Sequence, residues 1–459
     1  MFEEKIYKER RQELKNYLKK GVYLFLGNKE SPMNYPSNTY KFRQDSNFLY
    51  YFGIDEPDLA AIIDIDNDEE IIFGDDRTID DIIWMGTQDS IKEKAEKCGV
   101  KKTAEFASLT VFIDKAAASG CVINYLPQYR AENIIFLQTL LNNPSAGQCS
   151  QDFIKAVIRQ RSIKSAEEIE QIENALEISY EMNTAAMKFT RPGMRESEIS
   201  GIVEGISLAK GNGVSFPVIF TVRGETLHNH YHGNIMKEGD LALLDSGAES
   251  DLHYASDITR TFPVSGKFSE KQKEIYNIVL KSQVNAISIC KPGRKFREIH
   301  LETAKIIATG LKDAGIMKGS TDDAVLAGAH ALFFPHGLGH MLGLDVHDME
   351  GLGENLVGYG EEVSRSDQFG LAYLRLAKEL HTGFVTTIEP GIYFIPALIE
   401  KWKSENKHTD FINYNVLEKY MDFGGIRIED NILITGTGSR VLGRNPIPKT
   451  IEEVELCCR

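Results

Sequence analysis

The chain has 459 residues, a net charge of −15, 26% charged residues and 42% hydrophobic residues. This composition is typical of a globular protein, and the length suits about two or three domains of ~150 residues each. The negative net charge argues against nucleic acid or an anionic membrane as the main partner, because both select for a positively charged surface.

The cysteine pattern and the amino-terminal segment predict a cellular compartment. The six cysteines are scattered and form no zinc-type spacing, which predicts free thiols in a reducing compartment. Residues 2–11 are too charged to be a signal peptide, and no apolar run approaches the roughly 18 residues of a membrane span. We therefore expect a cytoplasmic protein without a membrane partner.

The first part of the chain alternates helical and strand patterns, which predicts an α/β domain. Residues 3–20 have the charged amphipathic pattern of a helix, and Val22–Leu26 has the pattern of a buried strand. Residues 60–65 and 70–73 are predicted to form a strand pair. Residues 142–148 are rich in Asn, Pro and Gly, which favours a loop or linker.

A helix is predicted from Ser165 to about Phe189, because Ser165 and Glu168 fit a capping box. We place the domain boundary near residue 160, just before this helix. A weak internal repeat follows: Arg191–Ile199 recurs as Lys291–Ile299, and each copy breaks a helical pattern at Pro-Gly. The repeat reflects either chance, since Pro and Gly commonly end helices, or a domain of two similar halves with a site at their junction.

Four carboxylates stand in apolar, strand-like runs, an unusual setting because acids are seldom buried without a partner. A single such acid is more often a cap, and a lone histidine is more often structural. Here five residues occur together, since the run His336–His340 lies between the two pairs of acids, and an offset of four places both histidines on one side. The four acids are Asp245, Asp257, Glu389 and Glu429.

Charge balance predicts how many cations such a site would hold. Four ionised carboxylates in a dry pocket repel one another, and without cations some would take up protons. One divalent ion leaves about two negative charges uncompensated, whereas two ions balance four carboxylates. Oxygen ligands with a single imidazole suit manganese, cobalt or zinc, and the absence of clustered cysteine argues against a structural zinc site.

Strand alternation places further residues beside the proposed ligands. Arg427 and Glu429 share a strand face, so the guanidinium can hold an anion or orient the carboxylate. Asp257, Thr259 and Thr261 share a face of the other strand by the same rule.

These motifs resemble the metallopeptidases of the pita-bread fold, family M24B, and among them the aminopeptidase P group. The likeness covers nearly the whole chain, since residues 39–58 resemble the signature of the family's amino-terminal domain. The segments that resemble its catalytic motifs, in family order, are Asp257–Val264, His336–Asp348, Glu389–Tyr393 and Ile426–Asp430.

The resemblance implies an α/β (α+β) fold class with two domains. Residues 1–160 would form the amino-terminal α/β domain, and residues 161–459 the pita-bread catalytic domain of two pseudo-symmetric halves. A homo-oligomer, either a dimer or a tetramer, is implied as well.

The resemblance also implies the metal ligands. Asp245 would bind one metal through both oxygens, Asp257 and Glu429 would bridge the two ions, and His340 and Glu389 would complete the other site. Two divalent ions are implied, with Mn²⁺ as the first choice and Co²⁺ or Zn²⁺ as alternatives.

The resemblance assigns further roles around the metals. His336 and His347 would contact the substrate or the tetrahedral intermediate, while Tyr393 and Arg427 would support the residues that bind the metals.

One further histidine of the family has two candidate matches in this chain. His228 matches by its distance before Asp245, and His230 is a rival. Since His228, His230 and His232 alternate, all three are predicted to share a strand face.

The implied activity is that of a metalloaminopeptidase which hydrolyses the bond between an amino-terminal residue and a following proline. A hydroxide bridging the two ions would attack the carbonyl, Glu389 could also carry protons, and the substrates would be peptides with proline second. The alternatives are an Xaa-Pro dipeptidase, a metal-free amidinohydrolase and a non-catalytic peptidase-like binding module. Two insertion-like stretches, about 354–382 and 397–420, adjoin the motifs and could form a rim that sets substrate length.

Overall fold

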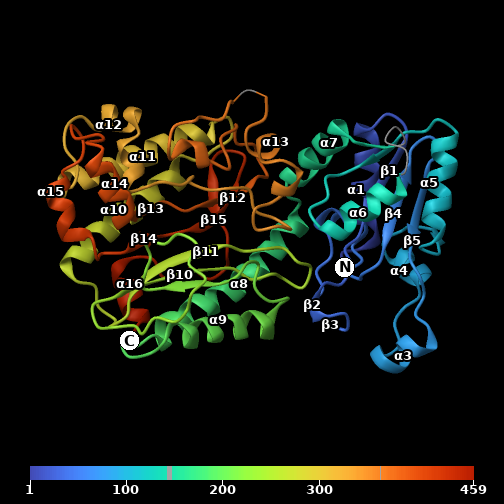
Figure 1. Cartoon of the computed structure of the whole chain (residues 1–459), viewed down its shortest axis with the longest axis horizontal. Helices are drawn as coiled ribbons and strands as arrows, with labels where there is room; N and C mark the ends of the chain where they lie inside the picture. Colours follow the sequence, from blue (N-terminus) through green and yellow to red (C-terminus); the bar gives the residue numbers. More distant parts are fainter. Residues whose placement is uncertain (142–146, 362) are drawn as a thin grey trace. The chain divides into compact units, whose positions relative to one another are not determined.

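The computed structural model describes residues 1–141, 147–361 and 363–459, which form two compact units (Figure 1). The amino-terminal unit comprises residues 1–161 with 351–353, and the carboxy-terminal unit comprises residues 162–350 and 354–459. Of the predicted loop at 142–148, residues 142–146 lie outside the described residues, and the last two belong to a short strand.

The amino-terminal unit is built on a six-stranded mixed sheet in the order β6-β5-β4-β1-β7-β8. Strand β1 is antiparallel to β4 and parallel to β7, and every residue of β1 and β4 is buried, which explains why these two strands are apolar throughout except for Asp64 at the end of β4. A small hairpin of β2 and β3 stands apart from this sheet. The strands are β1 (Val22–Leu26), β2 (Pro32–Tyr35), β3 (Asn38–Thr39), β4 (Ala60–Asp64), β5 (Glu69–Phe73), β6 (Lys102–Ala104), β7 (Ile123–Tyr125) and β8 (Gly147–Cys149).

Seven helices of the described residues accompany this sheet, and the helix predicted over residues 3–20 is confirmed as α1. Helix α3 buries none of its residues, although it carries several large apolar side chains. The helices are α1 (Glu4–Tyr17), α2 (Ser46–Phe52), α3 (Ile79–Met85), α4 (Ile91–Lys97), α5 (Ser108–Ala118), α6 (Ala131–Leu140) and α7 (Gln151–Ser162).

The carboxy-terminal unit contains two three-stranded sheets, β11-β10-β9 and β12-β15-β16, and the pair β13-β14. Within the described residues, all the strand pairings in these sheets are antiparallel. The strands are β9 (Ile219–Thr221), β10 (Leu241–Ser246), β11 (Ile258–Pro263), β12 (Val385–Ile388), β13 (Gly391–Tyr393), β14 (Gly425–Arg427), β15 (Asp430–Ile434) and β16 (Ser439–Val441).

Long helices cover these strands. Figure 1 shows α8 and α9 along one side of β10 and β11, with α10 and α11 on the other side of the unit, against the second set of strands. The capping box predicted at the start of α8 is confirmed: Ser165 accepts from the backbone of Glu168, whose side chain accepts from the backbone of Ser165. The helices are α8 (Ala166–Phe189), α9 (Glu196–Lys210), α10 (Glu270–Ile289), α11 (Phe296–Asp313), α12 (Thr321–Ala327), α13 (Glu354–Gly358), α14 (Pro396–Ser404), α15 (Tyr414–Leu417) and α16 (Ile451–Cys457).

The internal repeat corresponds to equivalent turns in two similar halves. In each copy the chain leaves a long helix, turns at a glycine with positive φ and enters the next helix. The glycines are Gly193 (φ 92°) and Gly293 (φ 84°), a region that favours glycine because it lacks a Cβ atom. The residue before each new helix makes an antiparallel bridge, Arg195 with Ile235 and Lys295 with Glu379.

The two halves are joined by polar contacts between β11 and the segment from β14 to β15. Thr261 Oγ1 donates to the carbonyl of Arg427 and accepts from its backbone N–H, both at 3.1 Å. The backbone N–H of Glu429 donates to the carbonyl of Thr259 at 3.0 Å. These contacts place residues from both halves at one junction, where the candidate site lies.

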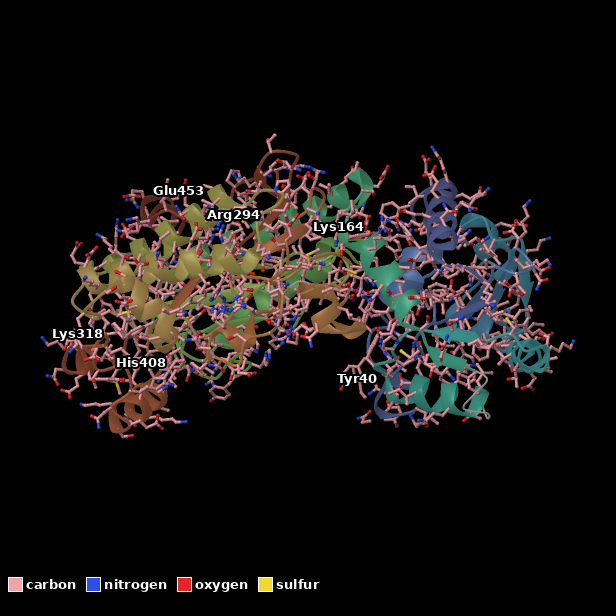
Figure 2. All side chains as sticks on the ribbon, turned by 90° about the horizontal axis from the view of Figure 1, so that it is seen from above. Tyr40, Lys164, Arg294, Lys318, His408 and Glu453 are labelled. Carbon is pink, nitrogen blue, oxygen red and sulfur yellow. The ribbon has the colours of Figure 1, made fainter. Side chains whose placement is uncertain are left out.

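The surface of the carboxy-terminal unit carries many charged side chains, among them Lys318 and Glu453, labelled in Figure 2. Within the described residues, no helix is both long enough and apolar enough to span a membrane.

Candidate metal centre and active site

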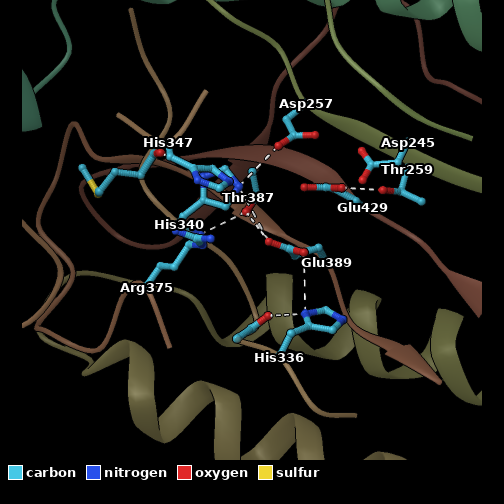
Figure 3. Close-up of polar contacts among 12 residues, drawn as sticks. Asp245, Asp257, Thr259, His336, His340, His347, Arg375, Thr387, Glu389 and Glu429 are labelled. Atoms are coloured by element: carbon cyan, nitrogen blue, oxygen red, sulfur yellow. Dashed lines mark hydrogen bonds and ion pairs between the residues drawn. The ribbon is translucent and has the colours of Figure 1, made fainter. Parts of the chain in front are cut away.

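The five predicted metal ligands come together where the two halves meet (Figure 3). Asp245 lies in β10 and Asp257 directly precedes β11, whereas Glu389 follows β12 and Glu429 separates β14 from β15. His340 lies in the non-helical segment after the short 3₁₀ helix at 329–332. All five line one cavity of about 590 Å³.

The ring of His340 is oriented for cation binding. Its Nδ1–H donates to the carbonyl of Met341 at 3.0 Å, which leaves the lone pair on Nε2. Its backbone N–H donates to Thr387 Oγ1 at 3.1 Å, which fixes the main chain. Nε2 then lies 3.3 Å from Asp257 Oδ2 and 3.7 Å from Glu389 Oε1, so an imidazole nitrogen and two carboxylates face one point.

Three buried carboxylate oxygens of the proposed ligands have no hydrogen-bond partner among the described residues: Asp245 Oδ1, Asp257 Oδ1 and Glu429 Oε1. Buried polar atoms are nearly always paired, so three orphaned acceptors at one place call for a positive partner. Asp257, His340 and Glu429 each offer a ligand atom, and these atoms lie within 4.8 Å of one another. The residues present therefore fit a divalent cation bound mainly through oxygen.

The electrostatics agree with this fit. Burial raises the pKa of Asp257 and of Glu429 well above the ordinary values, and the neighbouring carboxylates raise both further. Burial also raises the pKa of Glu389, although His340 and Arg427 oppose the shift. A cation at this point would offset the repulsion between these buried carboxylates, which they otherwise reduce by taking up protons.

Arg427 and Thr259 hold two of the carboxylates in place. Arg427 Nη2 donates to Asp245 Oδ2 at 2.5 Å, and Arg427 Nε donates to Thr259 Oγ1 at 3.0 Å. Thr259 Oγ1 in turn donates to Glu429 Oε2 at 2.6 Å. These three hydrogen bonds fix one oxygen each of Asp245 and Glu429 and leave the other oxygen of each without a hydrogen-bond partner in the described part of the chain.

His336 and Tyr393 continue the same network away from the carboxylates. Arg427 Nη1 donates to the Tyr393 hydroxyl at 2.8 Å, and that hydroxyl donates to His336 Nε2 at 2.8 Å. His336 Nδ1–H donates to the carbonyl of Gly337 at 2.8 Å. Burial lowers the pKa of His336 to about 3, so the ring is neutral and is held in one orientation. Tyr393 is fully buried behind the residues that line the cavity.

His347 lies against the His340 ring, with 4.2 Å between ring centroids, and it lines the cavity. Its Nδ1–H donates to Glu350 Oε2 at 2.8 Å, which orients the other nitrogen of the ring. Partial burial lowers the pKa of His347 to about 4, with a further contribution from His340.

The predicted strand face of His228, His230 and His232 is wrong. Residues 226–234 form turns and irregular chain, and the strand β9 ends at Thr221. His228 and His230 both line the cavity, whereas His232 Nδ1 contacts the carbonyl of Phe220 at 3.1 Å. The pKa of His228 is lowered by burial and then by the charge of Arg427, which places His228 near the arginine network.

Both insertion-like stretches contribute side chains to the cavity. Phe369, Tyr373 and Arg375 line it from the first stretch and Leu398 from the second. Phe369 packs edge-on against the buried Trp402 of α14, with 5.8 Å between ring centroids, so the two stretches support each other.

Three polar residues of this site were not predicted from the sequence. Thr387 bonds His340 and Glu389, and its position two residues before Glu389 was a usable signal, because strand alternation puts both on one face. Glu350 and Arg375 form an ion pair at 2.5 Å beside His347. Nothing local marks this pair, because its members are far apart in the sequence.

Comparison with known proteins identifies the family. The sequence profile of metallopeptidase family M24 matches residues 170–436, which contain every predicted metal ligand. The chain belongs to metallopeptidase family M24. The profile of the aminopeptidase P amino-terminal domain matches residues 7–123. Both matches confirm the resemblance, and membership of M24 implies divalent metal ions.

Curated relatives of this M24 chain carry two different activities in their names. A probable Xaa-Pro aminopeptidase of Sordaria macrospora is 34% identical over 420 residues, which covers 90% of this chain and 86% of the relative. The human Xaa-Pro dipeptidase is 32% identical over 442 residues, which covers 91% of this chain and 84% of the relative.

Solved structures confirm the pita-bread fold of the M24 family with its α/β amino-terminal domain. Zinc-substituted Escherichia coli aminopeptidase P in complex with product has a TM-score of 0.81 at 29% identity, covering 100% of this chain and 98% of that chain. Proline aminopeptidase P II from Yersinia pestis has a TM-score of 0.82 at 28% identity, covering 100% and 99%.

Proposed function

We propose that this M24 enzyme is an Xaa-Pro aminopeptidase with a dinuclear metal centre, which hydrolyses the bond between an amino-terminal residue and a following proline. The observation that carries the proposal is the set of orphaned oxygens of Asp245, Asp257 and Glu429 on the wall of an accessible cavity. Relatives named as Xaa-Pro aminopeptidases that match over 90% of this chain support the choice of substrate.

The proposed ligands divide into two kinds. Asp257 and Glu429 would serve both ions, as the family resemblance implies, and each presents one oxygen that has no hydrogen-bond partner among the described residues. Asp245 would complete one site, and His340 with Glu389 would complete the other. Two divalent ions would supply a Lewis acid for the scissile carbonyl and a water molecule acidified to near-neutral pKa.

The surrounding residues would bind and orient the peptide. His336 and His347 are neutral rings on the cavity wall. Both nitrogens of His336 are held, by Gly337 and Tyr393, whereas Glu350 holds one nitrogen of His347. Glu389 lies between two rings, 3.7 Å from His336 Nδ1 and 3.7 Å from His340 Nε2, and this proximity supports the proposal that its carboxylate carries a proton during the reaction. Tyr393 and Arg427 would keep this geometry without touching the metals.

Metal analysis and a peptide series test the proposal together. The purified protein, stripped of metal and titrated with Mn²⁺, Co²⁺ or Zn²⁺, is expected to bind close to two equivalents and to gain cleavage of Xaa-Pro-Yaa peptides. The change Asp257→Asn should lower both the stoichiometry and the turnover. A folded protein that binds no divalent metal, or one that cleaves only Xaa-Pro dipeptides, would refute the proposal.

One observation favours an Xaa-Pro dipeptidase as the second candidate. The guanidinium of Arg375 lines the cavity, and a cation is what the free carboxylate of a dipeptide would need. The likeness to the human Xaa-Pro dipeptidase over 91% of this chain is nearly as strong as that to the aminopeptidases. The two candidate activities therefore differ in what they require of Arg375 and its partners.

A further inference from the structure

The cavity offers few fixed positive charges to a substrate. Among the described residues that line it, the cationic side chains other than histidine are Arg375 and Arg427. Arg427 is almost fully buried and bonded to Asp245, Tyr393 and Thr259, so its charge is used within the protein. Arg375 has one third of its side chain exposed and is the cation that a substrate can approach.

Arg375 is already paired with two carboxylates. Its Nη1 donates to Glu350 Oε1 at 2.5 Å and lies 3.7 Å from Glu354 Oε2. Glu354 is itself bonded to Arg365. Charge-assisted bonds to Arg375 and His347 keep Glu350 ionised, and its pKa falls to about 2, with the His347 bond as the larger cause. At neutral pH the group around Arg375 therefore presents no net positive charge to the cavity.

The two candidate substrate classes differ in charge next to proline. In an Xaa-Pro dipeptide the proline carboxylate is free and anionic, and its carbon is two bonds from the scissile nitrogen. In a longer peptide the same carbonyl is part of a neutral amide. An anion at that position gains from an unpaired cation and loses from a carboxylate beside it, because charge pairs are strong where water is partly excluded.

We propose that Glu350 sets the substrate length: by pairing with Arg375 it withholds the cation that a dipeptide carboxylate needs, and so favours peptides that continue beyond proline. This inference rests on the proposed function, because it requires that the cavity binds Xaa-Pro peptides. Glu350 is a specificity and positioning residue, since it acts through Arg375 and His347.

A matched pair of substrates isolates the charge. Leu-Pro and Leu-Pro-amide differ only at the terminal group, so the ratio of their kcat/KM values cancels any uniform loss caused by misplacing His347. The wild-type enzyme should prefer the amide, and it should also cleave Leu-Pro-Gly. In Glu350→Gln, which removes the charge at nearly constant shape, the ratio of acid to amide should rise at least tenfold.

Two further variants define the controls. Arg375→Gln leaves Glu350 beside the cavity without its cation, so the acid-to-amide ratio should fall below that of the wild type. Glu400→Gln changes an exposed glutamate of α14, and the ratio should stay within twofold of the wild type. Added KCl should shrink the differences between variants, because the effect is electrostatic.

An acid-to-amide ratio that does not rise in Glu350→Gln, while the wild type cleaves Leu-Pro-Gly, overturns the inference and leaves the proposed function standing. A wild type that cleaves only Leu-Pro overturns both. If Glu350→Gln has no turnover, Glu354→Gln decides, because it removes the second carboxylate near Arg375 without touching His347. Its ratio should rise twofold to fivefold, and an unchanged ratio there rejects the inference.

Discussion

A buried ion pair fixes the segment that carries His347, and its loss should destabilise the carboxy-terminal unit. Lys164 Nζ donates to Asp348 Oδ2 at 2.7 Å, and both side chains are 1% exposed. Removing one partner of such a pair typically costs about 3–5 kcal/mol, because the other charge stays buried. We therefore expect Lys164→Met to lower the free energy of unfolding of this unit by about 3–5 kcal/mol.

The measurement is urea unfolding followed by the fluorescence of the buried Trp402, in a Trp84→Phe background that removes the exposed second tryptophan. The matched control is Lys210→Met, whose pair with Glu181 has a similar distance of 2.6 Å but side chains that are 49% and 44% exposed. That change should cost less than about 1 kcal/mol.

A second variant separates the ion pair from general packing. Lys164→Met combined with Asp348→Leu replaces both charges by apolar groups, and it should recover most of the lost stability. The reasoning is refuted if Lys164→Met is no worse than Lys210→Met, or if the double variant is as unstable as the single one.

Three further predictions concern acid stability, metal affinity and specificity. His330 is fully buried, and burial lowers its pKa to about 4, so its contribution to stability is complete above about pH 6.5 and is lost as the pH falls toward 4. The free energy of unfolding should therefore fall by about 3 kcal/mol less between pH 7 and pH 4 in His330→Leu than in the wild type, as measured by urea unfolding at both pH values. Thr259→Val removes the donor to Glu429 and should weaken metal binding about 10–100-fold, measured by titration of the stripped protein; unchanged affinity would contradict the role of this network. Leu398→Ala should reduce kcat/KM for peptides with large apolar side chains by roughly tenfold and spare small ones, since the lost contact is apolar; an equal loss for both would contradict this.

The site motifs could be predicted because each obeys a local rule. Alternation along β11 put Asp257, Thr259 and Thr261 on one face, and the structure shows the hydroxyls of Thr259 and Thr261 contacting the strand segment that carries Glu429. Strand alternation is fixed by the backbone, so this inference needed no knowledge of tertiary structure.

The histidine run shows where a period of two is not sufficient. Residues 228–232 alternate but have no continuous apolar face, so forming a strand there would bury little apolar surface and gain little stability. Polar side chains bond the backbone instead: the Asn229 side chain accepts from the N–H of Tyr231 and donates to Thr221 Oγ1, and His232 contacts the carbonyl of Phe220. Such local bonds compete with a strand ladder.

The pair of Glu350 and Arg375 could not be predicted at all. Its members belong to different segments, 25 residues apart, and neither stands in an apolar run that would mark it as unusual. Only the tertiary fold brings the guanidinium beside the carboxylate. Long-range ion pairs of this kind leave no periodic signal, so specificity was less predictable from sequence than the metal ligands were.

The structure also refines the argument about the number of metal ions. Arg427 compensates Asp245 at 2.5 Å, and His336 is neutral because its pKa is about 3, so three of the four carboxylates remain without a fixed cation. One divalent ion would leave about one negative charge in a dry site, which is unfavourable. Two ions would leave about one positive charge, which suits a site that must also hold an anion derived from water. Charge balance with Arg427 included therefore still favours two ions. The change Arg427→Met removes the cation that compensates Asp245, so the net charge of the site with two ions bound should fall from about +1 to about zero. This change should weaken binding of the anion more than binding of the metal ions.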